Sequence, residues 1–182
     1  MKPSTLARTD RLLIREMTMR DGADYYMIFS DPAASQYDEF EPMTLEELPV
    51  TMTKIIDRYG IGEEQEAGVE LLLERKMIGV LYWKVADPPE VQIGFHFNQA
   101  YLGKGYAFEA AEALILWLLG KYPNLPIVAL VDPENTHSIR LLDRLGFTRA
   151  ETAPSLKTYK GAQHREQRFL FAENRMNPSH ES

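Results

Sequence analysis

The sequence predicts a single α/β domain, of the α+β type, in which helices flank a central mixed β-sheet. Two observations predict this class. Along the 182 residues, segments with apolar side chains at every second position alternate with segments in which they recur at helical spacing, and these periods distinguish strands from helices. Between two helical segments, residues 125–131 form a continuous apolar run, which is typical of a strand buried on both faces. The strand–helix–strand step that ends there is expected to be parallel and right-handed.

The first half of the chain predicts a strand, two helices and a hairpin. In order, we expect a strand at residues 11–18, a helix at 19–31, a loop at 31–44, a helix at 44–60, a polar turn at 60–68 and two strands at 69–86. The second helix has the clearest limits, because Thr44 and Glu47 form a capping box at its start and Gly60 is a stop signal at its end. Residues 74–76 form a short charged turn, which predicts that the two strands make a hairpin.

The second half predicts strands and helices in alternation. In order, we expect a strand at residues 90–97, a helix that includes Phe108 and ends at Gly120, a strand at 125–131, a helix at 135–146, and last strands at 147–151 and 165–173. The strand at 90–97 has one apolar face, since every second side chain is apolar from Val91 to Phe97. We expect one domain at residues 1–173 and a flexible tail at residues 174–182.

Composition excludes several classes of function. The net charge is −7 and the pI is about 5.2, whereas a nucleic-acid binder usually carries a basic surplus. The absence of cysteine excludes disulfides, a cysteine nucleophile and a thiolate metal site. The histidines show no ligand spacing, so no metal is expected. No segment approaches the roughly 20 apolar residues that span a bilayer, and the N-terminus lacks a signal-peptide core. We therefore expect a cytoplasmic protein with no nucleic-acid and no membrane partner.

The turn at residues 102–107, LGKGYA, predicts an anion site. Gly103 and Gly105 remove side chains where the chain enters a helix, and the first N–H groups of a helix are unpaired and carry partial positive charge. Lys104 would add a full charge at the rim. The turn matches neither the P-loop nor the dinucleotide fingerprint. A plain tight turn and a nucleotide phosphate site both remain compatible with it.

Four segments, in the same order as in the family, resemble the GNAT acetyltransferase superfamily, and within it the RimJ/RimL-like branch of ribosomal-protein N-acetyltransferases. They are TDRLLIREMTMRD, IGFHFNQAYLGKGYAFEA, VDPENTHSIRLLDRLGF and GAQHREQRFLF. Together they run from Thr9 to Phe171. The pyrophosphate loop of this family reads Q/R-x-x-G-x-G/A. Gly105 and Ala107 match its small positions, and Leu102 departs from its first.

The resemblance implies the GNAT fold and a binding site for acetyl-CoA. In this fold the sheet splays, and the cofactor lies in a V-shaped opening between the strands at 90–97 and 126–131. Unpaired main-chain groups of the first strand would bond the pantetheine arm, because such groups need partners when they are buried. The implied cofactor contacts are Phe95, Phe97, Leu102, Gly103, Lys104, Gly105, Tyr106, Ala107 and Asn135.

The resemblance also implies candidates for catalysis. Its N-x-x-S/A motif places Asn135 beside the pantetheine and Ser138 near the sulfur, although an Asn at this position is also a common N-cap. Many members carry a tyrosine one turn later as general acid. Leu142 stands there, so Ser138 is the candidate to protonate the departing thiolate. An amine must lose a proton before it attacks, and Glu90 is favoured as the base, with His96 as an alternative. Glu90 as a solvated turn residue and His96 as a satisfied edge side chain are the other interpretations.

The segment YDEFEP at residues 37–42 is a candidate acceptor rim, with Tyr37 and Glu39 binding a cationic amine. A solvated acidic loop is the alternative. We thus predict an acetyl-CoA-dependent N-acetyltransferase that acts on a primary amine, a protein N-terminus or a small amine, by direct attack in a ternary complex. A non-catalytic acyl-CoA-binding sensor or assembly subunit is the other hypothesis. Monomer and homodimer are both compatible with the sequence.

Overall fold

The computed structural model describes residues 3–61 and 64–172. The first-half elements are β1 (Thr5–Arg8), β2 (Leu12–Arg15), a 3-10 turn (Met19–Asp21), α1 (Gly22–Phe29), α2 (Leu48–Asp57), β3 (Glu64–Leu71) and β4 (Lys76–Ala86). The second-half elements are β5 (Glu90–Phe97), a 3-10 turn (Gln99–Tyr101), α3 (Tyr106–Lys121), β6 (Ile127–Val131), α4 (Thr136–Leu145), β7 (Phe147–Arg149), β8 (Ser155–Tyr159) and β9 (Ala162–Phe171). The predicted tail at residues 174–182 lies outside the described residues.

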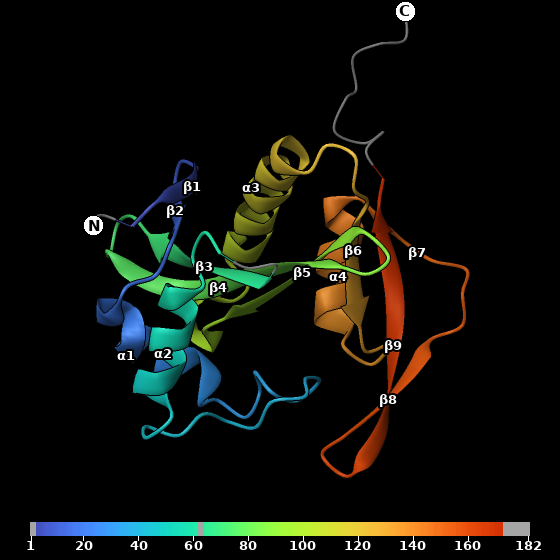
Figure 1. Cartoon of the computed structure of the whole chain (residues 1–182), viewed down its shortest axis with the longest axis horizontal. Coiled ribbons are helices and arrows are strands. Elements are labelled where there is room, and N and C mark those ends of the chain that lie inside the picture. Colours follow the sequence, from blue (N-terminus) through green and yellow to red (C-terminus); the bar gives the residue numbers. More distant parts are fainter. Residues whose placement is uncertain (1–2, 62–63, 173–182) are drawn as a thin grey trace, which may run out of the picture.

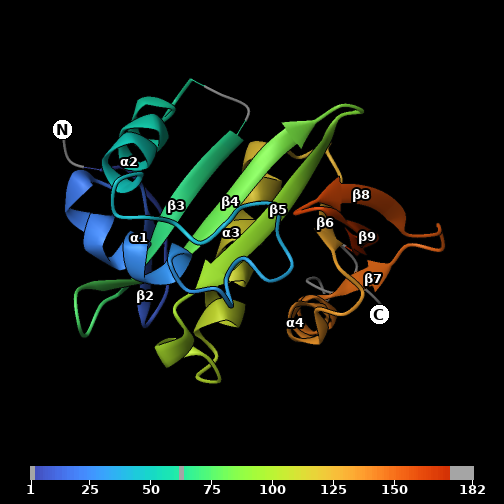
Figure 2. The same cartoon turned by 90° about the horizontal axis from the view of Figure 1, so that it is seen from below.

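These strands form one mixed sheet, which confirms the predicted fold class. Its order is β1-β2-β3-β4-β5-β6-β9-β7, and β8 pairs with β9. Every pair is antiparallel except β5 and β6, which run parallel across α3. In Figures 1 and 2, α1 and α2 cover one face of the first half of the sheet, and α3 covers the opposite face. Within the described residues, no helix is long and apolar enough to cross a membrane.

Two apolar clusters hold the layers together. The larger lies between the sheet and α3 and extends to α4; it includes Trp83, Leu114 and Leu118. The smaller lies between the sheet and α1 and α2, with Tyr25 and Met52 among its members. Fully burying one large aliphatic side chain contributes about 2 kcal/mol to folding. Because a cluster lies on each side of the sheet, apolar residues on both faces of the central strands stabilise the fold.

The parallel contact between β5 and β6 is short. Only Val91 with Ile127 and Gln92 with Val128 are paired, and the Val91 N–H donates to the Pro126 carbonyl oxygen at 2.9 Å. Beyond these pairs β6 continues its ladder with β9, while β5 continues with β4. The sheet therefore splays after Gln92, and this opening is the feature that positions the candidate site.

Two element boundaries differ from the sequence prediction. The capping box forms, with the Thr44 N–H donating to Glu47 Oε2 at 2.8 Å. However, it closes a turn, and α2 begins only at Leu48. The reason is Pro49, which lacks an N–H and fits only the first turn of a helix. β3 begins at Glu64, inside the segment predicted as a polar turn. The start of this strand resembles a turn in the sequence because the residues on one of its faces are charged.

β1 and β8 were not predicted. Both strands are four or five residues long, and most of their side chains are exposed or half-buried, so they carry no strong apolar pattern. The turn from β8 to β9 is tight. Lys160 and Gly161 both have positive φ, 49° and 71°, which is the geometry of a tight two-residue hairpin turn.

Candidate functional site

The glycine turn leads directly into α3. Gly103 and Gly105 have φ values of 74° and 81°, in the left-handed region, and Gly105 is the N-cap of α3. A residue with a side chain is strained in this region, and glycine is not. The helix begins at Tyr106, so the two glycines aim its first N–H groups out of the turn.

The N–H groups of this turn are available to a ligand. Leu102 donates its N–H to the Gln99 carbonyl oxygen at 3.2 Å, and Glu109 donates the first helical bond to Gly105 at 3.1 Å. Between them, no acceptor among the described residues meets the main-chain nitrogens of residues 103–108. The turn thus offers consecutive unpaired donors at the positive end of a 16-residue helix. Of the predicted contacts at residues 102–107, Leu102 is the one whose N–H is already used.

Side chains hold the turn in place by donating hydrogen bonds to main-chain carbonyl oxygens in it and just before it. Arg11 donates to the Lys104 carbonyl oxygen at 3.1 Å, pairs with Glu109 at 2.5 Å, and lies over the Tyr106 ring at 4.6 Å from its centroid. Lys104 Nζ donates to the Ala100 carbonyl oxygen at 3.2 Å. These contacts hold the turn without using its N–H groups.

The splayed part of β5 offers further main-chain groups. The Asn98 N–H donates to Ile78 at 2.9 Å, which sets the alternation of the ladder with β4. The main-chain groups of Phe95 and Phe97 therefore point away from β4, toward the side where pairing with β6 has stopped. The Phe97 ring is buried against Gly79. A ligand in the opening would thus meet these residues through their main chain.

Asn135 and Ser138 lie at the start of α4. The Asn135 side chain accepts the Ser138 N–H at 3.2 Å, which confirms it as the N-cap. The Ser138 hydroxyl has no hydrogen bond to any described residue and is half-buried. Leu142, one turn later, is fully buried in the core and presents no acid group.

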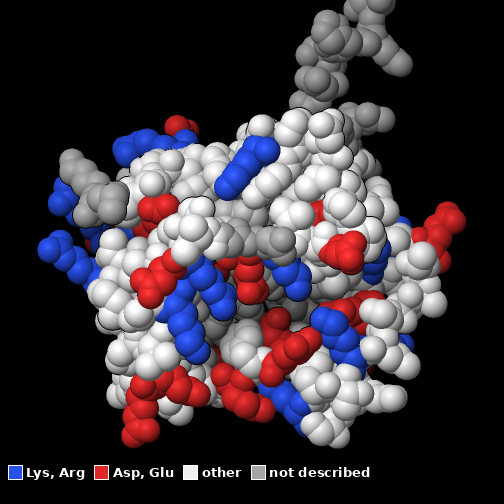
Figure 3. All heavy atoms as spheres, viewed as in Figure 1, with Lys and Arg blue, Asp and Glu red and all other residues white. Residues whose placement is uncertain are grey.

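A cleft of about 1050 Å³ lies on the face of the sheet that carries α1 and α2. Its walls come from residues 37–47, α2, strands β3 to β5 and the β8–β9 hairpin. Tyr37 and Glu39 both line it, so the structure places the predicted acceptor rim at this cavity. Figure 3 shows a hollow on this side, bordered by acidic and basic side chains. The acidic lining residues are Asp38, Glu39, Glu41, Glu46, Glu47, Glu64, Glu66, Asp132 and Glu166.

The β8–β9 hairpin closes the cleft against the acidic loop. Lys157 Nζ donates to Glu39 Oε1 at 3.0 Å, and Tyr159 Oη donates to the Tyr37 carbonyl oxygen at 3.1 Å. Lys160 Nζ donates to the Ser35 carbonyl oxygen at 2.6 Å. These contacts join segments more than one hundred residues apart. They were not predictable, because neither segment has a periodic pattern.

Burial shifts the proton affinities of the groups inside the cleft. It raises the pKa of Glu66 to about 7 and the pKa of Asp38 to about 6. Burial lowers the pKa of His96 to about 4, so this ring is neutral at pH 7. His96 lies among Phe29, Phe40 and Tyr82, and its Nε2 is 4.0 Å from Asp38 Oδ2.

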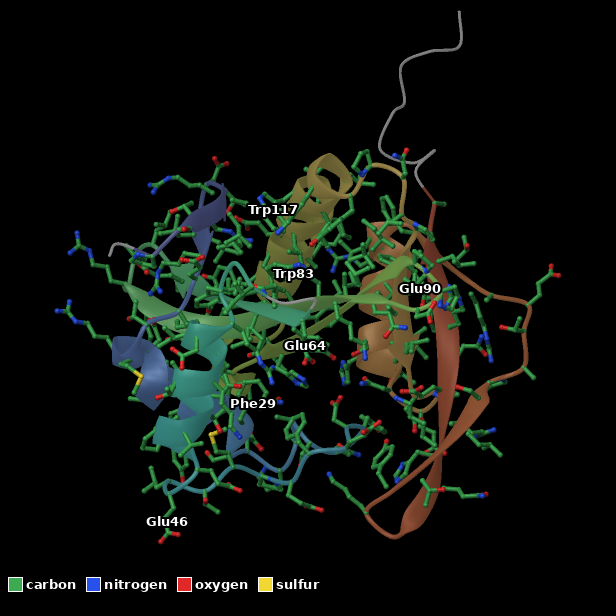
Figure 4. All side chains as sticks on the ribbon, viewed as in Figure 1. Phe29, Glu46, Glu64, Trp83, Glu90 and Trp117 are labelled. Carbon is green, nitrogen blue, oxygen red and sulfur yellow. The ribbon has the colours of Figure 1, made fainter. Side chains whose placement is uncertain are left out.

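Glu90 has a different environment from the one expected of a base. It is 5% exposed, and both of its oxygens bond the Arg168 guanidinium, one of them at 2.9 Å. Hydrogen bonds from Arg168 hold the pKa of Glu90 below its usual value despite its burial. Figure 4 shows Glu90 beside β9, apart from Glu64 and Phe29. The interpretation of Glu90 as a solvated turn residue is wrong, and its role as base, still a prediction, is not favoured by this pairing. His96 likewise lies on an interior strand, not at an edge.

Glu66 and Tyr82 were missed as site residues. Both stand in strands, and the signal that could have found Glu66 is the alternation of residues 64–71, in which every second residue is buried. That segment was assigned to a turn because of its acidic residues. Among the described residues, no group of three His, Asp or Glu side chains could hold a metal ion.

The chain is similar to known acetyltransferases. Residues 11–148 match the family model described as an acetyltransferase (GNAT) domain. The uncharacterized N-acetyltransferase p20 of Bacillus licheniformis is 28% identical over 156 residues, which cover 84% of this chain and 88% of the relative. A solved GNAT-family acetyltransferase from Bacillus anthracis has a TM-score of 0.80 at 25% identity, with 92% of this chain and 98% of that chain covered. RimL, a ribosomal L7/L12 α-N-protein acetyltransferase solved in complex with coenzyme A, shares the fold with a TM-score of 0.78 at 16% identity, over 92% and 97% of the two chains.

Proposed function

Because this chain belongs to the GNAT acetyltransferase family, we propose that it transfers the acetyl group of acetyl-CoA to a primary amine by direct attack in a ternary complex. The protein is an acyltransferase that uses acetyl-CoA. The observation that carries the proposal is the row of unpaired main-chain N–H groups at residues 103–107, at the mouth of the splay between β5 and β6.

Each part of the opening has a role in this proposal. The N–H groups of residues 103–107 hold the pyrophosphate, and the main chain of Phe95 and Phe97 bonds the pantetheine arm and the carbonyl oxygen that becomes negative. The Asn135 side chain contacts the pantetheine arm in this proposal, and the Ser138 hydroxyl assists the departing thiolate. Holding the amine and the thioester side by side supplies much of the acceleration.

The cleft supports a cationic acceptor. Nine carboxylates line it against four cationic side chains, Lys54, Lys84, Lys157 and Arg165. Such a lining attracts an ammonium group. In this proposal Tyr37 and Glu39, which line the cleft and contact the β8–β9 hairpin, form part of the acceptor site. RimL acts on a protein α-amino group by its name, so a protein N-terminus and a small amine are the two acceptor classes to test.

The direct test is acetyl transfer to a panel of amines. The purified chain is mixed with acetyl-CoA and, in turn, a peptide with a free N-terminus, a diamine, an amino acid and an aminoglycoside. Thiol release and the mass of the product are measured. We expect at least one amine to gain one acetyl group. Binding of acetyl-CoA without turnover on the whole panel would support the sensor hypothesis instead, and an absence of binding would contradict both.

Replacing Ser138 by Ala tests the role of its hydroxyl. We expect kcat to fall about tenfold, because a positioned proton donor usually contributes at least that much. The Kd for acetyl-CoA should stay within about twofold, since the pyrophosphate is held elsewhere. Thr136→Ala is the matched control, because Thr136 is exposed in the same helical turn. Equal losses in both variants would show that the effect comes from α4 and not from the hydroxyl.

A further inference from the structure

Glu66 differs from two other carboxylates at the cleft wall, Glu64 and Glu39. Its hydrogen-bond partner is Tyr25, whose Oη donates to Glu66 Oε2 at 3.4 Å, and it makes no ion pair with any described residue. Glu64, two residues earlier on the same face, pairs with Arg58 at 3.3 Å and is 56% exposed. Glu39 pairs with Lys157. A half-buried carboxylate at a cleft wall without a cation is costly unless a ligand balances its charge.

Glu66 belongs to a row of cross-strand neighbours that runs from β3 through β4 to β5, the strand at the splay. Glu66 is paired in register with Tyr82 of β4, and Tyr82 with Gly94 of β5. A Cβ atom at Gly94 would lie 1.9 Å from Tyr82 Cζ and 2.0 Å from its Oη. The Tyr82 ring therefore lies across β5, directly above the residue where a side chain is missing. Tyr82 Oη has no hydrogen bond to a described residue, and Tyr82 lines the cleft.

This row connects the acceptor cleft to the opening expected to hold the thioester. Neighbouring strands lie about 4.8 Å apart, so Glu66 is roughly 10 Å from β5, within reach of one or two bridging waters. We propose that Glu66 receives the proton that the acceptor ammonium loses before it attacks acetyl-CoA. The proposal rests on the acetyl transfer proposed above, and it places the base on β3, not at Glu90 on β5.

The step balances in protons and bonds. One N–H bond of the ammonium breaks, and its proton passes to a Glu66 oxygen through one or two bridging waters. The free amine forms the C–N bond with the carbonyl carbon while the C–S bond breaks. The second proton of the nitrogen goes to the thiolate beside Ser138. Glu66 then returns its proton to the solvent.

The other candidates fit this role less well. Arg168 already binds both oxygens of Glu90, and His96 is neutral with a pKa near 4 because of its burial. Asp38 lies on the loop, where the field of Lys160 partly offsets the effect of burial on its pKa. Glu66 stands on a strand of the sheet, so its position is set by the ladder and does not depend on the loop.

The surroundings of Glu66 set the direction of its pH dependence. The groups that interact with it are Tyr25, Arg58, Tyr59, Glu64 and Tyr82. Lys54, Lys84 and His96 line the same cleft. Burial raises its pKa to about 7, and Glu64 adds to this effect, while Tyr25 and Arg58 oppose it. Below this pH Glu66 is protonated and cannot accept a proton, so the rate should rise as the pH increases through 7.

The test is the pH profile of kcat/KM from pH 5.5 to 10 for the wild type and Glu66→Gln, with the most reactive amine of the panel. At pH 7 the variant should lose about 100-fold in kcat/KM. The loss should shrink as the pH approaches the amine pKa, about 8 to 10.4, because more of the acceptor is then already deprotonated. A variant that keeps the wild-type rate and profile overturns the proposal while leaving acetyl transfer intact.

Four further variants isolate the role of Glu66. Glu64→Gln removes the neighbouring charge on the same strand and should move the acid limb to lower pH, because Glu64 raises the pKa of Glu66. Glu90→Gln and Asp38→Asn test the alternative bases. If either of these moves the acid limb of the profile and Glu66→Gln does not, Glu66 is not the base. Tyr25→Phe should move the limb to higher pH, because the Tyr25 hydroxyl lowers the pKa of Glu66.

A titration without turnover decides the proposal independently of the panel. The chain is labelled with ¹³C at its glutamate carboxyl carbons, and the Glu66 signal is assigned by its loss in Glu66→Gln. We expect a midpoint near 7 for this signal. A midpoint near the ordinary glutamate value of about 4.3 would overturn the proposal even if no amine in the panel reacts.

Discussion

Replacing Gly105 by Val should raise the Kd for acetyl-CoA by about 100-fold, because it combines backbone strain with a side chain at the anion site. Gly105 has φ of 81° and is the N-cap of α3. A β-branched residue in this left-handed region is strained by roughly 1–2 kcal/mol. The turn is therefore expected to move out of this conformation, which changes the direction of the N–H groups of residues 103–107. Isothermal titration calorimetry with acetyl-CoA measures the loss.

A matched control separates strain from binding. Gly60 also has positive φ, 79°, with no neighbouring atom within 4 Å of its added Cβ, and it lies beyond the end of α2. Gly60→Val should therefore lower the melting temperature by a comparable amount and leave the affinity for acetyl-CoA unchanged. Lys104→Ala should cost only about threefold in affinity, since the side chain is a single exposed charge. Tight binding by Gly105→Val would contradict the proposed pyrophosphate site.

Replacing Arg15 by Ala should lower the free energy of unfolding by about 3 kcal/mol, since it leaves two carboxylates without their cation. Arg15 bonds Asp21 with both terminal nitrogens, at 3.0 and 2.8 Å, and Glu70 through Nε at 2.8 Å. The exposed fractions of the three side chains are 14%, 8% and 17%. Urea denaturation at pH 7 measures the change, which is large against a typical total stability of about 5–15 kcal/mol.

The pH dependence gives this prediction a second readout. Burial alone would raise the pKa of Asp21, but hydrogen bonds from Arg15 and Thr18 lower it overall. The stabilisation by Asp21 is therefore complete above its unfolded pKa of about 3.9 and is lost as the pH falls through the lower folded pKa. The difference between the wild type and Arg15→Ala should accordingly shrink in acid.

An exposed ion pair provides the control for Arg15. Arg58 pairs with Glu64 at 3.3 Å, with side chains that are 50% and 56% exposed. Arg58→Ala should lower the free energy of unfolding by less than about 1 kcal/mol, because water screens such a pair. A loss as large as that of Arg15→Ala would show that burial is not the reason for the effect.

Much of the architecture was predictable from local pattern. The alternation of Val91 to Phe97, the glycine turn and the apolar run at 125–131 each correspond to an observed element. Asn135 as N-cap is confirmed by its bond to the Ser138 N–H. These features depend on residues within a few positions of one another. Weakly patterned edge elements such as β8 were missed, because their stability comes from the strand beside them.

Except for β1 and β8, the sequence by itself determined the order of strands and helices, and it located the turn that offers unpaired N–H groups, because periodicity and backbone preference are local properties. Only the tertiary structure decided which carboxylates are paired. Glu90 meets Arg168, 78 residues away in the chain, while Glu66 faces a cleft that the hairpin closes. Proton affinity depends on burial and on charges brought near by folding, and neither can be read from the spacing of residues along the chain.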